Sequence, residues 1–291
     1  MNGSETSRDI CALHNCPRYA CPADCPARGG TERPAAADGG EMTFFKASSM
    51  DAAEGTAVTL EKGAKLGEGA FGSVFEATVG IGDKKKRFVV KEFKDGDLAG
   101  SPADTAENRA KDALEHWAAA KKAGLKVFPT YRLGEDGKSV LMTSGHDDAR
   151  ICVDPFPDDG ATVEKFGREK LQDIAGFDRL FEDLLKESRR AADHQIDIFP
   201  DAYFFLVDRN DDSVDFVLGD TDFLVTTPGA HPKDYATANL RRARLVLGSF
   251  IEKNVIGPKK DEYLRSLEER VNGLIAKMDE EEAEKYRDRK E

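Results

Sequence analysis

The stretch Leu66-Gly67-Glu68-Gly69-Ala70-Phe71-Gly72-Ser73-Val74 contains three glycines in the pattern G-x-G-x-x-G, followed by x-V. Glycines spaced in this way let a backbone approach phosphate groups closely, and Phe71 can cap such a loop. Dinucleotide-binding folds share the pattern, but in them it leaves a strand and opens a helix. Residues 73–79 instead form a β-rich run with no helix start, which indicates a glycine turn between two strands.

A lysine in a strand-like run follows the glycine stretch. Phe88-Val89-Val90-Lys91 places Lys91 19 residues after Gly72. A lysine flanked by apolar strand residues can point inward, where its ammonium group needs an anionic partner. Nucleotide phosphates and a helix carboxylate would supply that partner. The alternative is an exposed lysine on an edge strand.

The surrounding pattern predicts a small sheet with one inserted helix. Gly80–Gly82 and the Gly134–Gly137 segment mark turns between apolar runs. The strands are expected at 57–66, 73–79, 87–93, 127–133 and 138–143, and the helix at 103–123.

The second half is predicted to be mainly helical. It contains three apolar stripes, and the first has the i, i+3, i+4 spacing of a helix face. A two-strand element at 203–208 and 214–220 follows, and Gly257-Pro258 separates two further helices. The three stripes are Phe177, Leu180, Phe181, Leu184 and Leu185, then Leu240, Ala243, Leu247, Phe250 and Ile251, and last Leu264, Leu267, Val271, Leu274 and Met278.

Composition limits the classes of function. The 291 residues include 43 basic and 55 acidic side chains, for a net charge of −12. This balance argues against nucleic acid as a partner, because phosphate contacts need clustered Lys and Arg. No apolar run approaches the roughly 18–20 residues of a membrane span, so no membrane partner is expected. Five cysteines are too few for a disulfide scaffold of this size.

The two ends of the chain differ from the middle. Residues 1–50 are rich in Ala, Gly, Pro and charge, and are expected to form an irregular arm. Two readings of their thiols stay open, a zinc site and a flexible arm with redox-sensitive cysteines. Residues 279–291 are expected to form a charged tail. The residues of the N-terminal group are Cys11, His14, Cys16, Cys21 and Cys25.

Over roughly residues 57–255 the chain resembles the protein kinase superfamily, through the glycine turn and the Val-Val-Lys strand. The resemblance implies an α+β, bilobal fold. It places a five-stranded N-lobe with one helix at 51–145 and a reduced, mainly helical C-lobe at 146–278. It also implies ATP binding, by Leu66, Gly67, Gly69, Phe71, Gly72, Val74, Val89, Lys91 and Met142.

The resemblance implies further roles for acidic residues. Glu115 on the predicted helix would pair with Lys91, with Glu107 as the alternative. Asp201, in Phe199-Pro200-Asp201, would orient the attacking hydroxyl, although a register using Asp197 is also open. Asp220 would hold Mg²⁺ and Asp222 could share it. The catalytic residues implied are therefore Asp201, Lys91 and Glu115, and the metal ligands Asp220 and Asp222.

The chain also departs from the family pattern. It lacks the loop His and Arg and the second metal-binding Asn, and only about 70 residues follow Asp220. It is similar to the minimal kinases that pathogenic bacteria deliver into host cells. That likeness implies a monomeric cytosolic enzyme, secreted into a host, that uses ATP and Mg²⁺ to phosphorylate Ser, Thr or Tyr on a protein. Three alternatives are a pseudokinase binding module, an AMP transferase and a small-molecule kinase.

Overall fold

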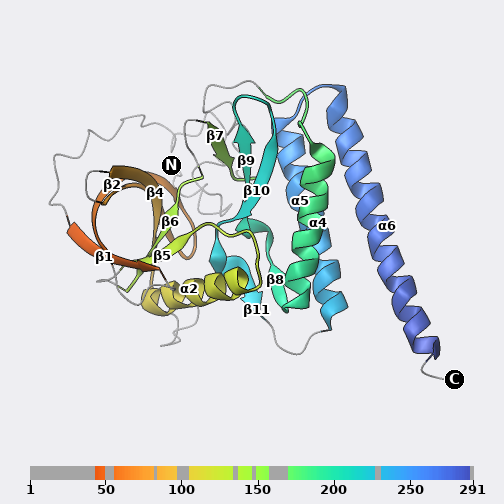
Figure 1. Ribbon diagram of the computed structural model, residues 1–291, viewed down its shortest axis with the longest axis horizontal. Coiled ribbons are helices and arrows are strands. Elements are labelled where there is room, and N and C mark those ends of the chain that lie inside the picture. The colour runs from red at the N-terminus through yellow and green to blue at the C-terminus, as the bar shows by residue number, and fades with distance from the viewer. Residues whose placement is uncertain are drawn as a thin grey trace, which may run out of the picture.

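The computed structural model describes residues 43–49, 56–81, 84–96, 105–133, 137–145, 149–156, 170–226 and 231–288. Within these ranges the chain has a mixed α+β fold with antiparallel strands and four α-helices. Figure 1 shows strands β1 to β6 curled into a barrel at one side and helices α4, α5 and α6 packed together at the other. Cys11, His14, Cys16, Cys21 and Cys25 lie outside the described residues.

Six antiparallel strands close into the barrel in the order β1-β2-β3-β4-β6-β5. β1 closes it by pairing with β2 on one side and with β5 on the other. The strands are β1 (Thr43–Ser49), β2 (Thr56–Glu68), β3 (Gly72–Ile81), β4 (Lys84–Phe93), β5 (Thr130–Leu133) and β6 (Ser139–Thr143). Their inward side chains form an apolar cluster of Leu60, Ala77, Val79, Phe88, Val90 and Leu141.

Helix α2 (Ala106–Lys122) packs on the outside of the barrel. Its small side chains, which include Ala106, Ala110 and Ala113, form one cluster with Phe93 of β4 and Val140 of β6. The first turn is capped twice, because Asn108 N donates to Thr105 Oγ1 and Ala106 N donates to Asp95 Oδ1. The second cap ties the start of α2 to the chain that leaves β4.

The other part of the molecule is built on three long helices. Most residues of the apolar stripes predicted from the sequence are buried in the core around these helices, and Leu264, Leu274 and Met278 are partly buried against it. The ring centres of Phe205 and Phe250 lie 4.5 Å apart in this core. The helices are α4 (Phe177–Asp193), α5 (Pro232–Asn254) and α6 (Pro258–Asp288). A sheet in the order β10-β9-β7 consists of β10 (Val214–Leu218), β9 (Tyr203–Asp208) and β7 (Arg150–Val153), and β8 (Ile196–Ile198) pairs with β11 (Leu224–Thr226).

Two boundaries expected from the sequence need correction. Thr43–Ser49 forms strand β1 inside the range expected to be an irregular arm, since β2 and β5 supply backbone partners that its own sequence does not reveal. The expected tail begins at residue 279, but α6 continues to Asp288. Lys233 of α5 pairs with Asp279 at 2.8 Å and with Glu282 at 2.5 Å, so this part of α6 is docked.

Among the described residues, no helix combines the length and the apolar character that crossing a membrane requires.

Candidate functional site

Lys91 is the centre of the candidate site. Its Nζ atom lies 2.7 Å from Asp220 Oδ1, 2.9 Å from Asp220 Oδ2 and 2.6 Å from Asp222 Oδ2. Only 8% of the Lys91 side chain is exposed. Burial alone would lower the pKa of Lys91, but the two carboxylates outweigh burial and raise it. Lys91 therefore remains an ammonium ion held between two aspartates.

The barrel presents Lys91 on its outer face. Residues paired across antiparallel strands point to the same side, and Lys91 pairs with Val74 of β3 and Val140 of β6. Val89, two residues earlier on β4, shares this side and pairs with Met142. Val74, Val89 and Met142 thus lie on the same face of the barrel as Lys91.

The opposite wall is the segment that carries the two aspartates. Leu218 N donates a hydrogen bond to Lys126 O at 2.8 Å, and Leu218 O accepts one from Phe128 N at 2.9 Å. Gly219 N donates to Ala202 O at 2.8 Å. The short 3-10 turn η3 (Thr221–Phe223) follows, and Thr221 Oγ1 donates to Ala113 O of α2 at 2.9 Å. These bonds fix the segment that carries both carboxylates, and Asp222 itself lies in the η3 turn.

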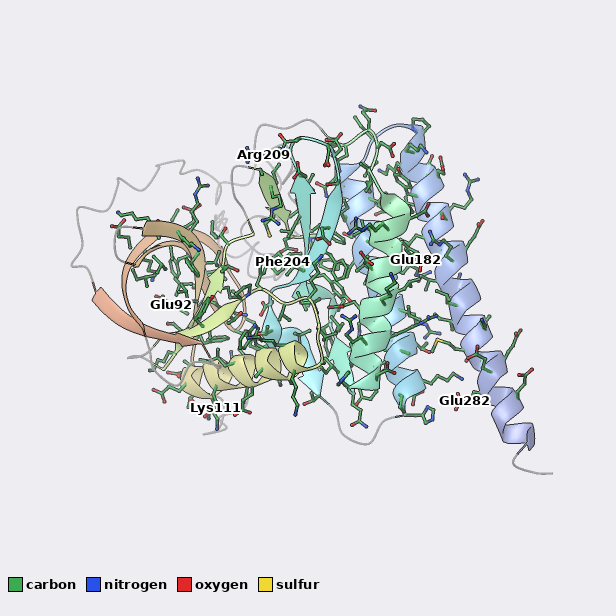
Figure 2. All side chains as sticks on the ribbon, in the orientation of Figure 1. Glu92, Lys111, Glu182, Phe204, Arg209 and Glu282 are labelled. Atoms are coloured by element: carbon green, nitrogen blue, oxygen red, sulfur yellow. The ribbon has the colours of Figure 1, made fainter. Side chains whose placement is uncertain are left out.

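The carboxylate expected from α2 does not reach Lys91. Glu115 is exposed and lies 3.7 Å from Lys111, and Glu107 is exposed and lies 3.8 Å from Lys138. The reason is helical geometry, since Glu115 is about 200° around the helix from Ala113, which packs on the barrel. Figure 2 shows Lys111 on the side of α2 turned away from the barrel. The Lys91–Glu115 pair is corrected to Lys91 with Asp220 and Asp222.

The structure separates the two candidates for the catalytic-loop aspartate. Asp197 on β8 is ion-paired with Arg242 of α5. Asp201, in the 3-10 turn η2 (Pro200–Ala202), has no hydrogen bond or ion pair with any residue that the structure describes. Burial, and then the negative charge of Asp220, raise the pKa of Asp201, against the effect of Lys91. Of the two candidates, Asp201 is thus the one whose carboxylate forms no ion pair and feels the charges of Asp220 and Lys91.

One acidic residue of this region was not found from the sequence. Asp154 directly follows β7, and its Oδ1 accepts a hydrogen bond from Phe156 N at 2.9 Å. The surrounding protein, and then the charges of Asp201 and Asp220, raise its pKa. No motif marks Asp154, and β7 itself was not predicted, so only the pairing of β7 with β9 could reveal it.

The three glycines of the turn have different surroundings. A Cβ atom on Gly67 or Gly69 would meet no other atom within 4 Å, whereas one on Gly72 would lie 2.3 Å from Glu92 O. Gly72 is therefore required by the β3–β4 pairing, and Gly67 and Gly69 border open space. Leu66, at the entrance to the turn, is 54% exposed. A phosphate group could approach the backbone on this side.

The residues that could hold Mg²⁺ are the two aspartates on Lys91. Mg²⁺ commonly binds one or two carboxylates and completes its shell with phosphate oxygens and water. Asp220 and Asp222 fit that donor set. Across the described ranges, this site included, no group of three or more His, Cys, Asp or Glu side chains is arranged to hold a metal ion.

The pKa of Asp222 predicts how stability depends on pH. Burial raises it to about 6, and Asp220 adds to the shift while Lys91 opposes it. Because an unfolded aspartate has a pKa near 4, the folded state binds this proton more tightly. The stabilisation from the bound proton is complete below about pH 4 and is lost as pH rises through about 6. We expect the unfolding free energy to fall, between pH 4.5 and 7.5, more in wild type than in Asp222→Asn.

Urea unfolding at several pH values would measure this difference. Asp193→Asn, a change at an exposed position of α4, is the matched control and should follow the wild-type profile. Parallel profiles for wild type and Asp222→Asn would contradict the prediction.

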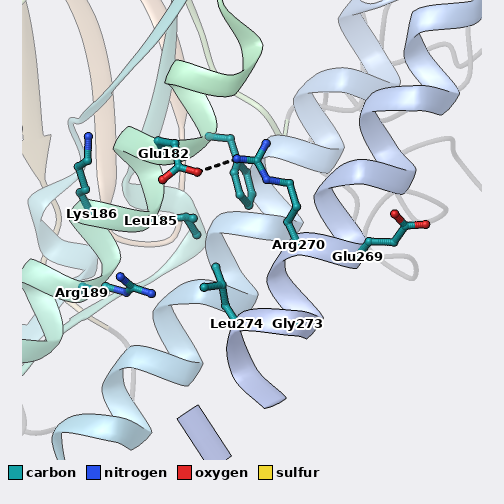
Figure 3. Close-up of a pocket in the computed structure, with 9 residues that line it drawn as sticks. Glu182, Leu185, Lys186, Arg189, Glu269, Arg270, Gly273 and Leu274 are labelled. Atoms are coloured by element: carbon teal, nitrogen blue, oxygen red, sulfur yellow. Dashed lines mark hydrogen bonds and ion pairs between the residues drawn. The ribbon is translucent and has the colours of Figure 1, made fainter. Parts of the chain in front are cut away.

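A separate groove lies between α4 and α6, with a volume of about 470 Å³. Figure 3 shows Glu182 paired with Arg270 across it, and Leu185 facing Leu274. The groove contains none of the residues predicted to bind a nucleotide. It is lined by Phe181, Glu182, Leu185, Lys186, Arg189, Glu269, Arg270, Gly273 and Leu274.

Comparison of the sequence with protein-family models and with curated proteins finds no match to either.

Proposed function

We propose that this protein is a minimal, kinase-like phosphotransferase that moves the γ-phosphate of ATP to a hydroxyl group of a protein. The observation that supports this most is the position of Lys91 between Asp220 and Asp222, on a strand that pairs with the strand following the glycine turn. Lysine, metal-binding carboxylates and a glycine turn are the parts that phosphoryl transfer requires. The bilobal arrangement belongs to the same proposal.

In this proposal each residue has one task. Val74, Val89 and Met142 contact the adenine, and the backbone at Gly67 and Gly69 lies along the phosphates. Lys91 neutralises phosphate charge, and Asp220 and Asp222 hold Mg²⁺. Bound Mg²⁺ would supply further neutralisation of the charge that develops on the transferred group. Asp201 accepts or orients the proton of the acceptor hydroxyl.

The test is transfer of label from ATP. Purified protein with Mg²⁺ is incubated in bacterial and eukaryotic lysates with γ-labelled or α-labelled ATP, in parallel. We expect γ-label on protein bands in wild type and none after EDTA. Label that persists in Lys91→Ala would assign the activity to another enzyme. Label from α-ATP alone would replace the proposal with transfer of AMP.

A second candidate is a nucleotide-binding module without turnover. The exposed position of Glu115 favours it, because no carboxylate of α2 holds Lys91 toward a nucleotide. ATP binding without transfer of label under any of these conditions would support this candidate and overturn the first.

A further inference from the structure

Thr221 stands between the two aspartates of the candidate site and is itself buried, with only 3% of its surface exposed. Its Oγ1 atom donates a hydrogen bond to Ala113 O of helix α2 at 2.9 Å. The residues on either side of it, Asp220 and Asp222, both pair with Lys91. One hydroxyl group therefore connects the turn that carries both carboxylates to a carbonyl in the middle of α2.

Helix α2 is also connected to the chain that precedes the aspartates. One helical turn further along α2, Trp117 Nε1 donates to Phe128 O at 2.9 Å. Phe128 N in turn donates to Leu218 O at 2.9 Å, two residues before Asp220. Helix α2 thus holds the chain before Asp220 through Trp117 and the chain after it through Thr221.

The same helix packs on the barrel face that carries Lys91. Ala113 belongs to one apolar cluster with Phe93 of β4 and Val140 of β6. Val140 pairs with Lys91 across the sheet, and Lys91 Nζ lies 5.1 Å from the centre of the Phe93 ring. The contacts therefore form a closed circuit, from Lys91 through the two aspartates, Thr221 and α2 back to the barrel beside Lys91.

This circuit matters for a metal ion because Mg²⁺ demands near-ideal octahedral geometry, so two carboxylates that share one ion must be directed at the same point. Their directions depend on the backbone of the turn between them. Resting on the proposed nucleotide site, we propose that Thr221 is a positioning residue, whose hydrogen bond to α2 sets Asp220 and Asp222 in the arrangement that binds Mg²⁺ with the nucleotide. Helix α2 then acts on the metal ligands through this hydroxyl, whereas its carboxylate Glu115 does not reach Lys91.

The experiment is calorimetric binding of a non-hydrolysable ATP analogue to the full chain, without Mg²⁺ and over a range of Mg²⁺ concentrations. Thr221→Val removes the hydroxyl and keeps the branched shape of the side chain. We expect it to raise the Mg²⁺ concentration for half-maximal effect about tenfold and to leave the affinity without Mg²⁺ unchanged. Thr221→Ser keeps the hydroxyl and should stay within about twofold of wild type.

The matched control is Ser188→Ala. Ser188 is fully buried, and its Oγ donates to Leu184 O at 2.9 Å within α4. This variant also loses one buried hydrogen bond from a hydroxyl to a backbone carbonyl, but away from the aspartates. Urea unfolding should therefore show a loss of stability in Ser188→Ala and in Thr221→Val, while only Thr221→Val changes the dependence on Mg²⁺.

The outcomes separate a positioning role from a structural one. If Thr221→Val weakens binding equally with and without Mg²⁺, or leaves the dependence on Mg²⁺ as in wild type, the inference fails. An equal change in Thr221→Ser overturns it too, because the hydroxyl would then not carry the effect. A changed dependence on Mg²⁺ in Thr221→Val, in a protein that transfers no label, overturns the proposed function alone. A wild type that binds no nucleotide under any of these conditions overturns both.

Discussion

Replacing Asp201 with asparagine is expected to lower phosphoryl transfer by about 10²- to 10⁴-fold, while the affinity for ATP stays close to that of wild type. No side chain among the described residues forms a hydrogen bond or ion pair with the Asp201 carboxylate, and its pKa is raised by burial and by Asp220. Asparagine keeps the size of the side chain and cannot accept the proton. The step lost is therefore the activation of the acceptor hydroxyl and not the binding of nucleotide.

The matched control for this result is Asp197→Asn. Asp197 is paired with Arg242, whose guanidinium also lies 4.1 Å from the centre of the Phe199 ring. The contacts among Asp197, Arg242 and Phe199 hold the chain that leads to Asp201. Asp197→Asn should therefore lower the free energy of unfolding, and it should reduce phosphoryl transfer only as far as it reduces the amount of folded protein. Transfer rates and calorimetric affinities for both variants would measure the difference. A larger loss of transfer in Asp197→Asn than in Asp201→Asn would assign the catalytic role to Asp197.

The second large effect is expected in the barrel. Gly72→Ala should destabilise the protein by about 2–3 kcal/mol, since the new Cβ atom would lie 2.3 Å from the backbone oxygen of Glu92. Backbone cannot move aside as a flexible side chain can, so the β3–β4 pairing must shift. Urea unfolding would measure the loss, and hydrogen exchange of β3 and β4 amides would place it in the barrel.

Gly69→Ala is the comparison within the same turn. Its Cβ atom would meet nothing within 4 Å, so we expect a change in stability of no more than about 0.5 kcal/mol. The same atom would occupy the space proposed for phosphates, so the affinity for ATP should fall. Equal stability of Gly72→Ala and Gly69→Ala would show that the β3–β4 pairing tolerates a side chain at residue 72.

Some errors of the sequence interpretation were avoidable, and others were not. The buried face of α2 could be read from its alanines, and it places Glu115 on the far side of the helix. That signal argued against Glu115 as the partner of Lys91. Asp154 had no comparable signal, because a four-residue strand such as β7 has too few residues for a clear pattern. The choice between Asp197 and Asp201 depended on Arg242, which is 45 residues from Asp197.

Local patterns in the sequence determined the strands on either side of the glycine turn and the apolar stripes of the helices. Each of these follows from a repeat of two or 3.6 residues within one element. The tertiary structure alone decided that β1 closes the barrel and that Asp220, 129 residues away, meets Lys91. Such long-range contacts depend on how whole elements pack against one another. The hydrophobic periodicity within a single element contains no information about that packing.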